Sequence, residues 1–231
     1  MNRKIIITGS SKGIGQYLRD YYLESGDIVF GCSRGDLDFQ HKNYYHFSLN
    51  ISDEKSVKKM FKKIRTKFHS IDILVNNAGV ASMNHSLLTK LNTLNSIFET
   101  NFIGTFLFCR EAAKIMQKSK FGRIINFSTV AVPLNLEGEA IYASSKAAVV
   151  SLTKILSKEF SSFGITVNAI GPTPVKTDLI KSVPEPKIRN LINMQSLKRY
   201  GEYKDISNVV DFFIAEESDF ITGQILYLGG I

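Results

Sequence analysis

The chain has 231 residues, of which 44% are hydrophobic and 22% are charged, values that are ordinary for a soluble globular protein long enough to bury a full core. The two cysteines, Cys32 and Cys109, are too few for a disulfide framework and lack a metal-binding spacing, so no metal site is expected and a cytoplasmic location is favoured. The N-terminal apolar run Ile5–Ile7 is too short for a signal peptide or a membrane span, so no membrane partner is expected.

Apolar runs typical of strands alternate along the chain with amphipathic stretches typical of helices. The predicted strands are Lys4–Thr8, Ile28–Cys32, Tyr44–Leu49, Ile71–Val75, Arg123–Ser128, Thr166–Ile170 and Gln224–Leu228. The predicted helices are Gly13–Ser25, Asp53–Phe68, a long region ending near Lys118, and Ala140–Phe163. This alternation indicates an α/β fold with a parallel seven-stranded sheet and helices on both faces. Since no linker or repeat divides the chain, residues 1–231 are expected to form a single doubly wound Rossmann domain.

Much of the formal net charge of +8 lies within Glu54–Phe68. Five apolar residues recur there at helical spacing, so the lysines fall on the opposite, solvent-facing side. The pattern is typical of a solvated amphipathic helix, and no nucleic-acid-binding motif accompanies it, so no nucleic-acid partner is expected. A basic surface can still attract an anionic substrate or an acidic carrier protein.

A glycine-rich turn, Thr8-Gly9-Ser10-Ser11-Lys12-Gly13-Ile14-Gly15, follows the first predicted strand and opens a helix. Glycines let the backbone turn sharply and approach a pyrophosphate, and the helix offers its free N–H groups to that anion. A plain strand-to-helix turn is the alternative, but the strand–turn–helix context favours a dinucleotide site. The predicted cofactor-binding residues of this turn are Gly9, Ser11, Lys12, Gly13, Ile14 and Gly15.

The end of the second predicted strand bears on which dinucleotide is bound. An acidic residue there selects NAD(H), because it accepts hydrogen bonds from the ribose 2′-hydroxyl. This chain has Ser33 and Arg34 instead, and Arg34 and Lys12 together can bind a 2′-phosphate. Asp36 and Asp38 argue for NAD(H), but they lie beyond the strand end. NADP(H) is therefore the preferred cofactor and NAD(H) the alternative.

Five motifs, in this order, resemble those of the short-chain dehydrogenase/reductase family, and together they extend over nearly the whole chain. They are Thr8–Gly15, Asn76-Asn77-Ala78-Gly79, Asn101, Tyr142-Ala143-Ser144-Ser145-Lys146 and Ile221-Thr222-Gly223. Within the family, the chain most resembles the 3-oxoacyl-acyl-carrier-protein reductases. The resemblance implies an enzyme that transfers a hydride between NADP(H) and a carbonyl or alcohol carbon.

Tyr142 and Lys146 stand four residues apart in a predicted helix and therefore share one face. A phenol titrates near about 10, and a neighbouring ammonium is expected to lower that value. The pattern alone is common by chance in helices. The family resemblance implies that Tyr142 is the general acid and base and that Lys146 also binds the nicotinamide ribose.

The family places a serine hydroxyl thirteen residues before the tyrosine, and Thr129 occupies that position here. Threonine retains a hydroxyl donor for the substrate oxygen, while its methyl group narrows the pocket. Ser128, on the opposite face of the predicted strand, is the alternative. The resemblance also implies that Asn101 kinks a helix and holds a water on Lys146.

Three further segments are expected at the cofactor by resemblance. Asn77, Ala78 and Gly79 follow the fourth predicted strand at its carboxyl end, although a turn is the simpler explanation. Asn50 and Ile51 follow the third predicted strand and match a pair that contacts adenine. After the sixth predicted strand, Pro172, Val175 and Thr177 are expected near the nicotinamide or a phosphate, on a loop where Thr173 and Pro174 replace the usual glycine-containing sequence.

Residues 179–196 are expected to form a substrate lid with basic and apolar side chains. The predicted partner is a small carbonyl or alcohol substrate, either free or carried on a protein; 3-oxoacyl thioester reduction is the leading hypothesis. A sugar or sugar-nucleotide substrate, or a weakly catalytic cofactor-binding sensor or scaffold, are the alternatives. The family resemblance implies a homotetramer, or next a homodimer, formed through the regions Leu94–Lys118 and Ala140–Phe163.

Overall fold

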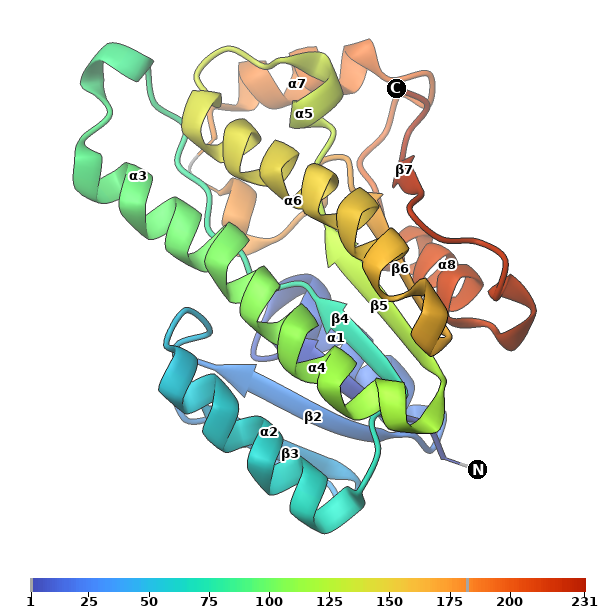
Figure 1. The fold of residues 1–231 in the computed structure, drawn as a ribbon. Coiled ribbons are helices and arrows are strands. Elements are labelled where there is room, and N and C mark those ends of the chain that lie inside the picture. Colours follow the sequence, from blue (N-terminus) through green and yellow to red (C-terminus); the bar gives the residue numbers. More distant parts are fainter. Residues whose placement is uncertain (1, 182) are drawn as a thin grey trace.

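The computed structural model describes residues 2–181 and 183–231, and its central feature is a seven-stranded parallel sheet with the order β3-β2-β1-β4-β5-β6-β7 (Figure 1). The strands are β1 Lys4–Thr8, β2 Ile28–Ser33, β3 Tyr44–Ser48, β4 Ile73–Asn76, β5 Gly122–Phe127, β6 Ile165–Gly171 and β7 Ile225–Tyr227. The predicted α/β class, the seven parallel strands and their positions are confirmed, with differences of a few residues at the strand ends.

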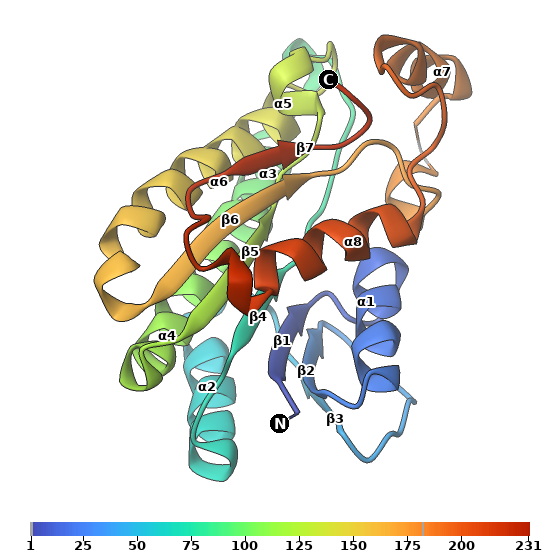
Figure 2. The same ribbon diagram turned by 90° about the vertical axis from the view of Figure 1, so that its right-hand side faces the viewer.

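Helices cover both faces of this sheet (Figures 1 and 2). They are α1 Gly13–Glu24, α2 Glu54–Phe68, α3 Leu91–Phe98, α4 Thr105–Ser119, α5 Ala131–Leu134, α6 Ala140–Glu159, α7 Glu185–Met194 and α8 Tyr203–Ile214. A π-helical segment, Glu99–Gly104, joins α3 to α4, and short 3₁₀ turns occupy Ser86–Leu88, Ser161–Phe163, Asp178–Ile180 and Glu216–Ser218. None of the helices in the described ranges is long and apolar enough to cross a membrane.

The two faces of the sheet carry separate cores because alternate residues of each strand point in opposite directions. Ile6 packs with apolar residues of α2, α4 and α6, whereas Ile5 and Ile7 pack with those of α1 and α8. The three isoleucines are fully buried. This explains the continuous apolar runs, since both faces of a central parallel strand are covered.

The helix α8 was not among the predicted elements. It forms because Ile206, Val210 and Phe213 recur at helical spacing and bury one face against the sheet, and because Glu202 and Asp205 form a capping box at its start. In Figure 2, α8 lies beside α1 on the same side of the sheet.

Strand order reverses between β1 and β4, so the chain leaves these two neighbours toward opposite faces. Such a switch point leaves a crevice at the carboxyl ends of the strands, where ligands bind in doubly wound sheets. The glycine-rich turn follows β1, and the Asn77–Gly79 segment follows β4. The fold therefore brings two of the predicted motifs together.

The loop between β2 and β3 is tied down by a buried arginine of α1. The guanidinium of Arg19 lies 3.9 Å from the centre of the Phe39 ring, and Phe39 in turn packs edge-on against Tyr44. Arg19 also donates a hydrogen bond of 3.2 Å to the carbonyl of Ser10 in the glycine-rich turn. These contacts join the turn after β1 to the loop that carries Arg34.

Candidate active site

The glycine-rich turn has the backbone shape that its sequence predicts. Gly9 and Gly13 adopt φ values of +69° and +58°, which side-chain-bearing residues rarely adopt. A Cβ atom on Gly15 would fall within contact distance of the Gly9 carbonyl oxygen and of Nδ2 of Asn77. The Asn77 side chain donates hydrogen bonds through Nδ2 to the backbone carbonyls of Thr8, at 2.9 Å, and Gly9, at 3.3 Å. Asn77 therefore braces the turn from β4.

The N-terminus of α1 is suited to an anion. Among the described residues, no side chain caps its first N–H groups and its first turn contains no acidic residue. The exposed groups and the helix dipole both favour a negative charge there. Together with the close approach that Gly9 and Gly15 permit, this arrangement fits the pyrophosphate of a dinucleotide.

A cavity of about 420 Å³, here called the turn-side cavity, opens at this helix terminus. It brings together most of the predicted cofactor residues: Gly9, Ser11, Lys12, Gly13, Ile14, Ser33, Arg34, Asn50, Ile51, Asn77, Ala78, Gly79 and Thr177. Arg34 is exposed at the end of β2, and Lys12 lies 3.4 Å from the carboxylate of Asp178. The side-chain amide oxygen Oδ1 of Asn50 accepts hydrogen bonds from the N–H and the hydroxyl of Ser52, so that acceptor is used locally.

A second cavity of about 420 Å³, here called the tyrosine-side cavity, adjoins the first and shares Ile14, Asn77, Gly79 and Thr177 with it. It is lined by Tyr142, Lys146, Thr129 and Ser128, and by Pro172 and Val175 of the loop after β6. Thr177 packs over Gly13, so this loop passes above the glycine-rich turn. The sites predicted for the two parts of a dinucleotide are therefore continuous.

Lys146 is buried, and its Nζ donates a hydrogen bond of 2.8 Å to the carbonyl of Phe127 at the end of β5. Burial lowers the pKa of Lys146 to about 8. A Cβ atom on Gly79 would lie 3.4 Å from this Nζ and 3.3 Å from Oδ1 of Asn101. The absence of a side chain at position 79 therefore lets the lysine and the asparagine approach the same place.

Tyr142 differs from the expectation in one respect. Burial raises its pKa to about 12; the nearby Thr129 hydroxyl opposes part of this rise, and Glu139 contributes a smaller part of it. The sequence predicted a lowered value because of Lys146. The direction is reversed because loss of solvent on burial disfavours the charged phenolate. Tyr142 is therefore protonated at neutral pH in this structure.

Thr129 and Ser128 face different neighbours. The Thr129 hydroxyl lies near the Tyr142 phenol and lowers its pKa. The same hydroxyl oxygen accepts a hydrogen bond of 3.2 Å from the N–H of Ala131, so the hydroxyl proton of Thr129 remains available for donation. The Ser128 hydroxyl is buried, and its neighbour is Tyr227 of β7. Of the two predicted alternatives, Thr129 lies beside the tyrosine.

Asn101 lies in the π-helical segment and is fully buried. Its amide pairs with the backbone of Val80 through two hydrogen bonds of 2.9 Å, and it donates one of 3.0 Å to the hydroxyl of Ser145. A widened turn at this point agrees with the helix irregularity expected from the family resemblance. Asn101 lines neither cavity directly and instead ties the segment after β4 to α6.

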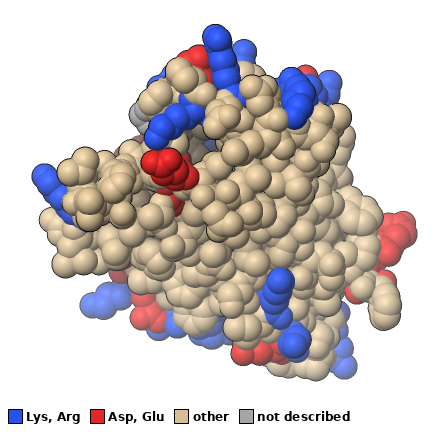
Figure 3. Space-filling view, turned by 90° about the horizontal axis from the view of Figure 1, so that it is seen from above, with Lys and Arg blue, Asp and Glu red and all other residues tan. Residues whose placement is uncertain are grey.

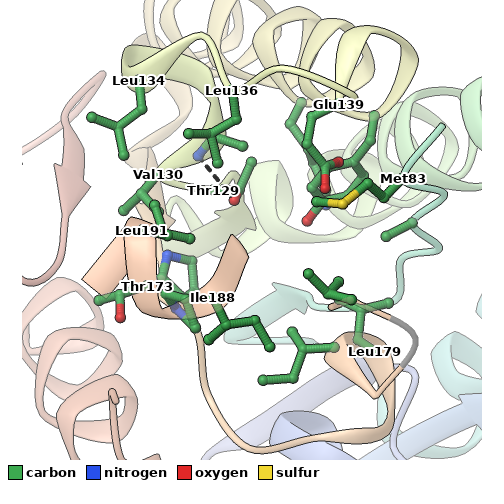
Figure 4. Close-up of a pocket in the computed structure, with 18 of the residues that line it drawn as sticks. Met83, Thr129, Val130, Leu134, Leu136, Glu139, Thr173, Leu179, Ile188 and Leu191 are labelled. Atoms are coloured by element: carbon green, nitrogen blue, oxygen red, sulfur yellow. Dashed lines mark hydrogen bonds between the residues drawn. The ribbon is translucent and has the colours of Figure 1, made fainter. Parts of the chain in front are cut away.

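Beyond these polar groups, the lining of the tyrosine-side cavity is mainly apolar. Figure 4 shows Leu134, Leu136, Ile188 and Leu191 around it, with Glu139 beside Met83. Leu179, Ile180, Leu191 and Met194 come from the predicted lid, within which Ser182 lies outside the described residues. Seen from the end of the molecule that carries α5 and α7, a hollow opens beside acidic and basic side chains (Figure 3).

Sequence reasoning missed the lining contributed by Met83, by the segment Val130–Glu139 and by Thr173. Apart from the short helix α5, these residues lie in loops, where neither periodicity nor spacing indicates which side chains face a cavity. The position of Glu139, three residues before Tyr142, was the one available signal.

Comparison with known proteins places the chain in a family. Residues 36–230 match the family model described as enoyl-(acyl carrier protein) reductase. The 3-oxoacyl-[acyl-carrier-protein] reductase FabG of Escherichia coli (strain K12) is 31% identical, over 97% of this chain and 95% of that protein. Among solved structures, ElxO with NADP bound is 30% identical and superposes with a TM-score of 0.90, over 99% of this chain and 97% of ElxO.

A second similar solved structure contains NADH, the other dinucleotide. 4-Hydroxyisoleucine dehydrogenase complexed with NADH is 27% identical and has a TM-score of 0.89, over 99% of this chain and 98% of that one. The family model spans most of the chain, and the FabG relative is more than 30% identical over nearly all of it. The chain therefore belongs to the short-chain dehydrogenase/reductase family of oxidoreductases.

Proposed function

We propose that this protein is an NADP(H)-dependent oxidoreductase that reduces a ketone to a secondary alcohol, or catalyses the reverse reaction. The observation that carries the proposal is the shared cavity of Tyr142, Lys146 and Thr129, which continues into the cavity at the glycine-rich turn. A proton donor, a cation and a hydroxyl donor thus surround one space beside a dinucleotide-shaped site.

The turn-side cavity fits NADP(H) by its charge as well as by its backbone. Gly9, Gly13 and the N-terminus of α1 would hold the pyrophosphate, with Asn50 and Ile51 at the adenine and Asn77–Gly79 alongside. Arg34 and Lys12 would bind the 2′-phosphate at the end of β2. Pro172, Val175 and Thr177 would contact the nicotinamide end. When bound, NADPH supplies the hydride for carbonyl reduction.

The residues of the chain supply the proton and the polar contacts. Tyr142, protonated at neutral pH, donates its proton to the carbonyl oxygen as negative charge develops there. The Thr129 hydroxyl donates a hydrogen bond to the same oxygen. Lys146 binds the ribose and holds a cation near the phenol, and Asn101 fixes the segment at Gly79 against α6. A protonated tyrosine suits the reductive direction.

The substrate class is narrowed by the lining of the tyrosine-side cavity. Its leucines, isoleucines and methionines favour a substrate with an apolar body, such as an acyl chain. A sugar nucleotide would bring many hydroxyls against apolar side chains, which costs free energy without matching partners. Together with the names of the relatives, this favours 3-oxoacyl thioesters as the first class to test, free or on a carrier protein.

The decisive experiment follows NADPH consumption with a panel of ketones that includes acetoacetyl thioesters. We expect turnover by the wild type and a loss of about 100- to 10,000-fold in kcat for Tyr142→Phe, since the phenol is the proton donor. NADPH affinity, measured by calorimetry, should stay within about threefold, because the hydroxyl is removed without changing the turn. Equal turnover in this variant would refute the proposed proton donor.

The proposed assembly is a homotetramer, with a homodimer as the next candidate. Phe106 of α4 and Ile155 of α6 leave large apolar side chains exposed on the helices that the family resemblance assigns to subunit contacts. Light scattering after size-exclusion chromatography tests the assembly, and a monomer at micromolar concentration would contradict it.

A further inference from the structure

The tyrosine-side cavity contains a carboxylate that the proposed mechanism does not use. Glu139 is only 7% exposed, and its Oε2 atom is fully buried without a hydrogen-bond partner among the described residues. Burying a carboxyl group without a partner is unfavourable whether it is charged or neutral, and such a group calls for an explanation. The residue is therefore a candidate for a role toward a ligand.

Glu139 has no evident structural role. It immediately precedes α6, and its backbone carbonyl accepts a hydrogen bond of 2.7 Å from Ala143, but its side chain makes no capping bond. Nor does the carboxylate form an ion pair within 4.0 Å with a lysine or arginine of residues 2–181 and 183–231. The backbone alone starts the helix, so the side chain is free to serve the cavity.

The carboxylate lies close to the reacting groups. Glu139 stands three residues before Tyr142, and its charge contributes to the raised pKa of the Tyr142 phenol. Figure 4 shows it beside Met83 at the cavity, across from Leu136, Ile188 and Leu191. Since these neighbours cannot donate hydrogen bonds, a hydroxyl on the molecule that fills the cavity can supply the donor that Glu139 lacks.

The charge near Glu139 selects between two kinds of donor. The ammonium of Lys187, on α7, lies near Gly138 and acts on the carboxylate from the lid side. A second cation would meet repulsion from Lys187, whereas a neutral hydroxyl would not. Leucine, isoleucine and methionine side chains make up much of the lining, so an otherwise apolar substrate fits it. A substrate with one hydroxyl close to its ketone satisfies all three conditions.

We propose that Glu139 is a specificity-determining residue that accepts a hydrogen bond from a hydroxyl group borne near the reacting ketone of an otherwise apolar substrate. This inference rests on the proposed reductase function and narrows it. A 3-oxoacyl thioester that lacks such a hydroxyl leaves the carboxylate unpaired and is used less well than a hydroxy-ketone. The preference arises because a site built around a buried polar group rejects an analogue that lacks its partner.

The test compares three aliphatic ketones of equal chain length, one plain, one with a hydroxyl beside or one carbon removed from the carbonyl, and one with an amine there. We expect the wild type to prefer the hydroxy-ketone over the plain ketone by about 10- to 100-fold in kcat/KM. Glu139→Leu should abolish this preference, and Glu139→Gln, which retains an acceptor oxygen, should keep part of it. Glu159→Gln, at the exposed end of the same helix, should behave as the wild type.

A binding arm keeps this inference separate from the proposed catalysis. Calorimetry with NADPH-loaded Tyr142→Phe measures affinity for the same ketones without turnover, alone and combined with Glu139→Leu. Hydroxyl-selective binding that Glu139→Leu removes would support Glu139 even if no ketone is reduced, which would refute only the reductase. Equal binding of the plain ketone and the hydroxy-ketone, a preference that survives Glu139→Leu, or a preference for the amine would each overturn the inference. Circular dichroism of each variant confirms that it is folded.

Discussion

The two adjoining cavities differ in what builds them. The turn-side cavity is shaped by backbone, with Gly9 and Gly13 at positive φ, Gly15 in close contact, and the free N–H groups of α1. The tyrosine-side cavity is shaped by side chains from loops and from α7, such as Met83, Leu136 and Ile188. A backbone-built site tolerates little change, whereas a side-chain-built site can change its ligand while keeping its chemistry. The first accordingly reveals the cofactor class, and the second is where we expect the substrate to be selected.

The largest effect expected in this comparison lies in the tyrosine-side cavity. Replacing Thr129 by valine keeps its shape but removes the hydroxyl beside Tyr142, so we expect kcat to fall by about 100- to 1000-fold. Thr129→Ser retains the donor and should stay within about tenfold of the wild type. Steady-state kinetics with NADPH and a reducible ketone measures both. If Ser128→Ala causes the larger loss, the other predicted hydroxyl is the one that acts.

The backbone-built site should respond to a single methyl group. In Gly15→Ala, the new Cβ meets the Gly9 carbonyl and the Asn77 amide, so we expect a loss of about 1 to 3 kcal/mol in unfolding free energy and weakened NADPH binding. Gly35→Ala is the matched control, because nothing lies within 4 Å of a Cβ there. Urea unfolding and calorimetry provide the measurements. Unchanged NADPH affinity in Gly15→Ala would contradict the assignment of the turn.

The next prediction concerns the positive charge of Arg34 in the turn-side cavity. Arg34→Asp replaces the cation proposed for the 2′-phosphate by an acceptor for a ribose hydroxyl, so we expect the ratio of NADPH to NADH affinities to fall by about 10- to 100-fold. Arg65→Asp, exposed on α2, alters net charge by the same amount and serves as the control. An equal fall in both variants would show a general electrostatic effect instead.

The smallest expected effect concerns stability and arises in the side-chain-built site. Burial raises the pKa of Glu139 from its ordinary 4.5 to about 7, and Lys187 opposes part of the rise. The folded protein therefore retains a proton that the unfolded chain loses, so the unfolding free energy falls as pH rises from about 4.5 to 7. Glu139→Gln should remove this slope and add about 1 kcal/mol at neutral pH.

Urea unfolding across this pH interval measures the effect, with Glu159→Gln as the exposed control. Parallel pH profiles for the wild type and Glu139→Gln would show that the carboxylate is not strained by burial. The same titration would then weaken the argument that its donor is supplied by a ligand.

Most of the fold and most residues of the turn-side cavity could be predicted from local sequence. The sheet was predicted from the strand patterns, and the residues around the turn from the glycine spacing and the segment after β4. Each of these signals depends on residues that are close together in the sequence. Long-range effects escaped prediction. The raised pKa of Tyr142 depends on burial, and that of Glu139 on burial and on the opposing charge of Lys187 from α7, neither of which the local sequence indicates. Helix α8 was missed because it follows an irregular, proline-containing region.

The anchored loop between β2 and β3 has a consequence for how cofactor choice can change over evolutionary time. Arg19, Phe39 and Tyr44 hold that loop through packing in which Arg34 takes no part. Because Arg34 is the cation proposed for the 2′-phosphate, we expect a mutation at position 34 to change the dinucleotide preference without rebuilding this support, so that a lineage would reach a different redox pool in one step. The chain would keep its fold while the dinucleotide that supplies its electrons changes.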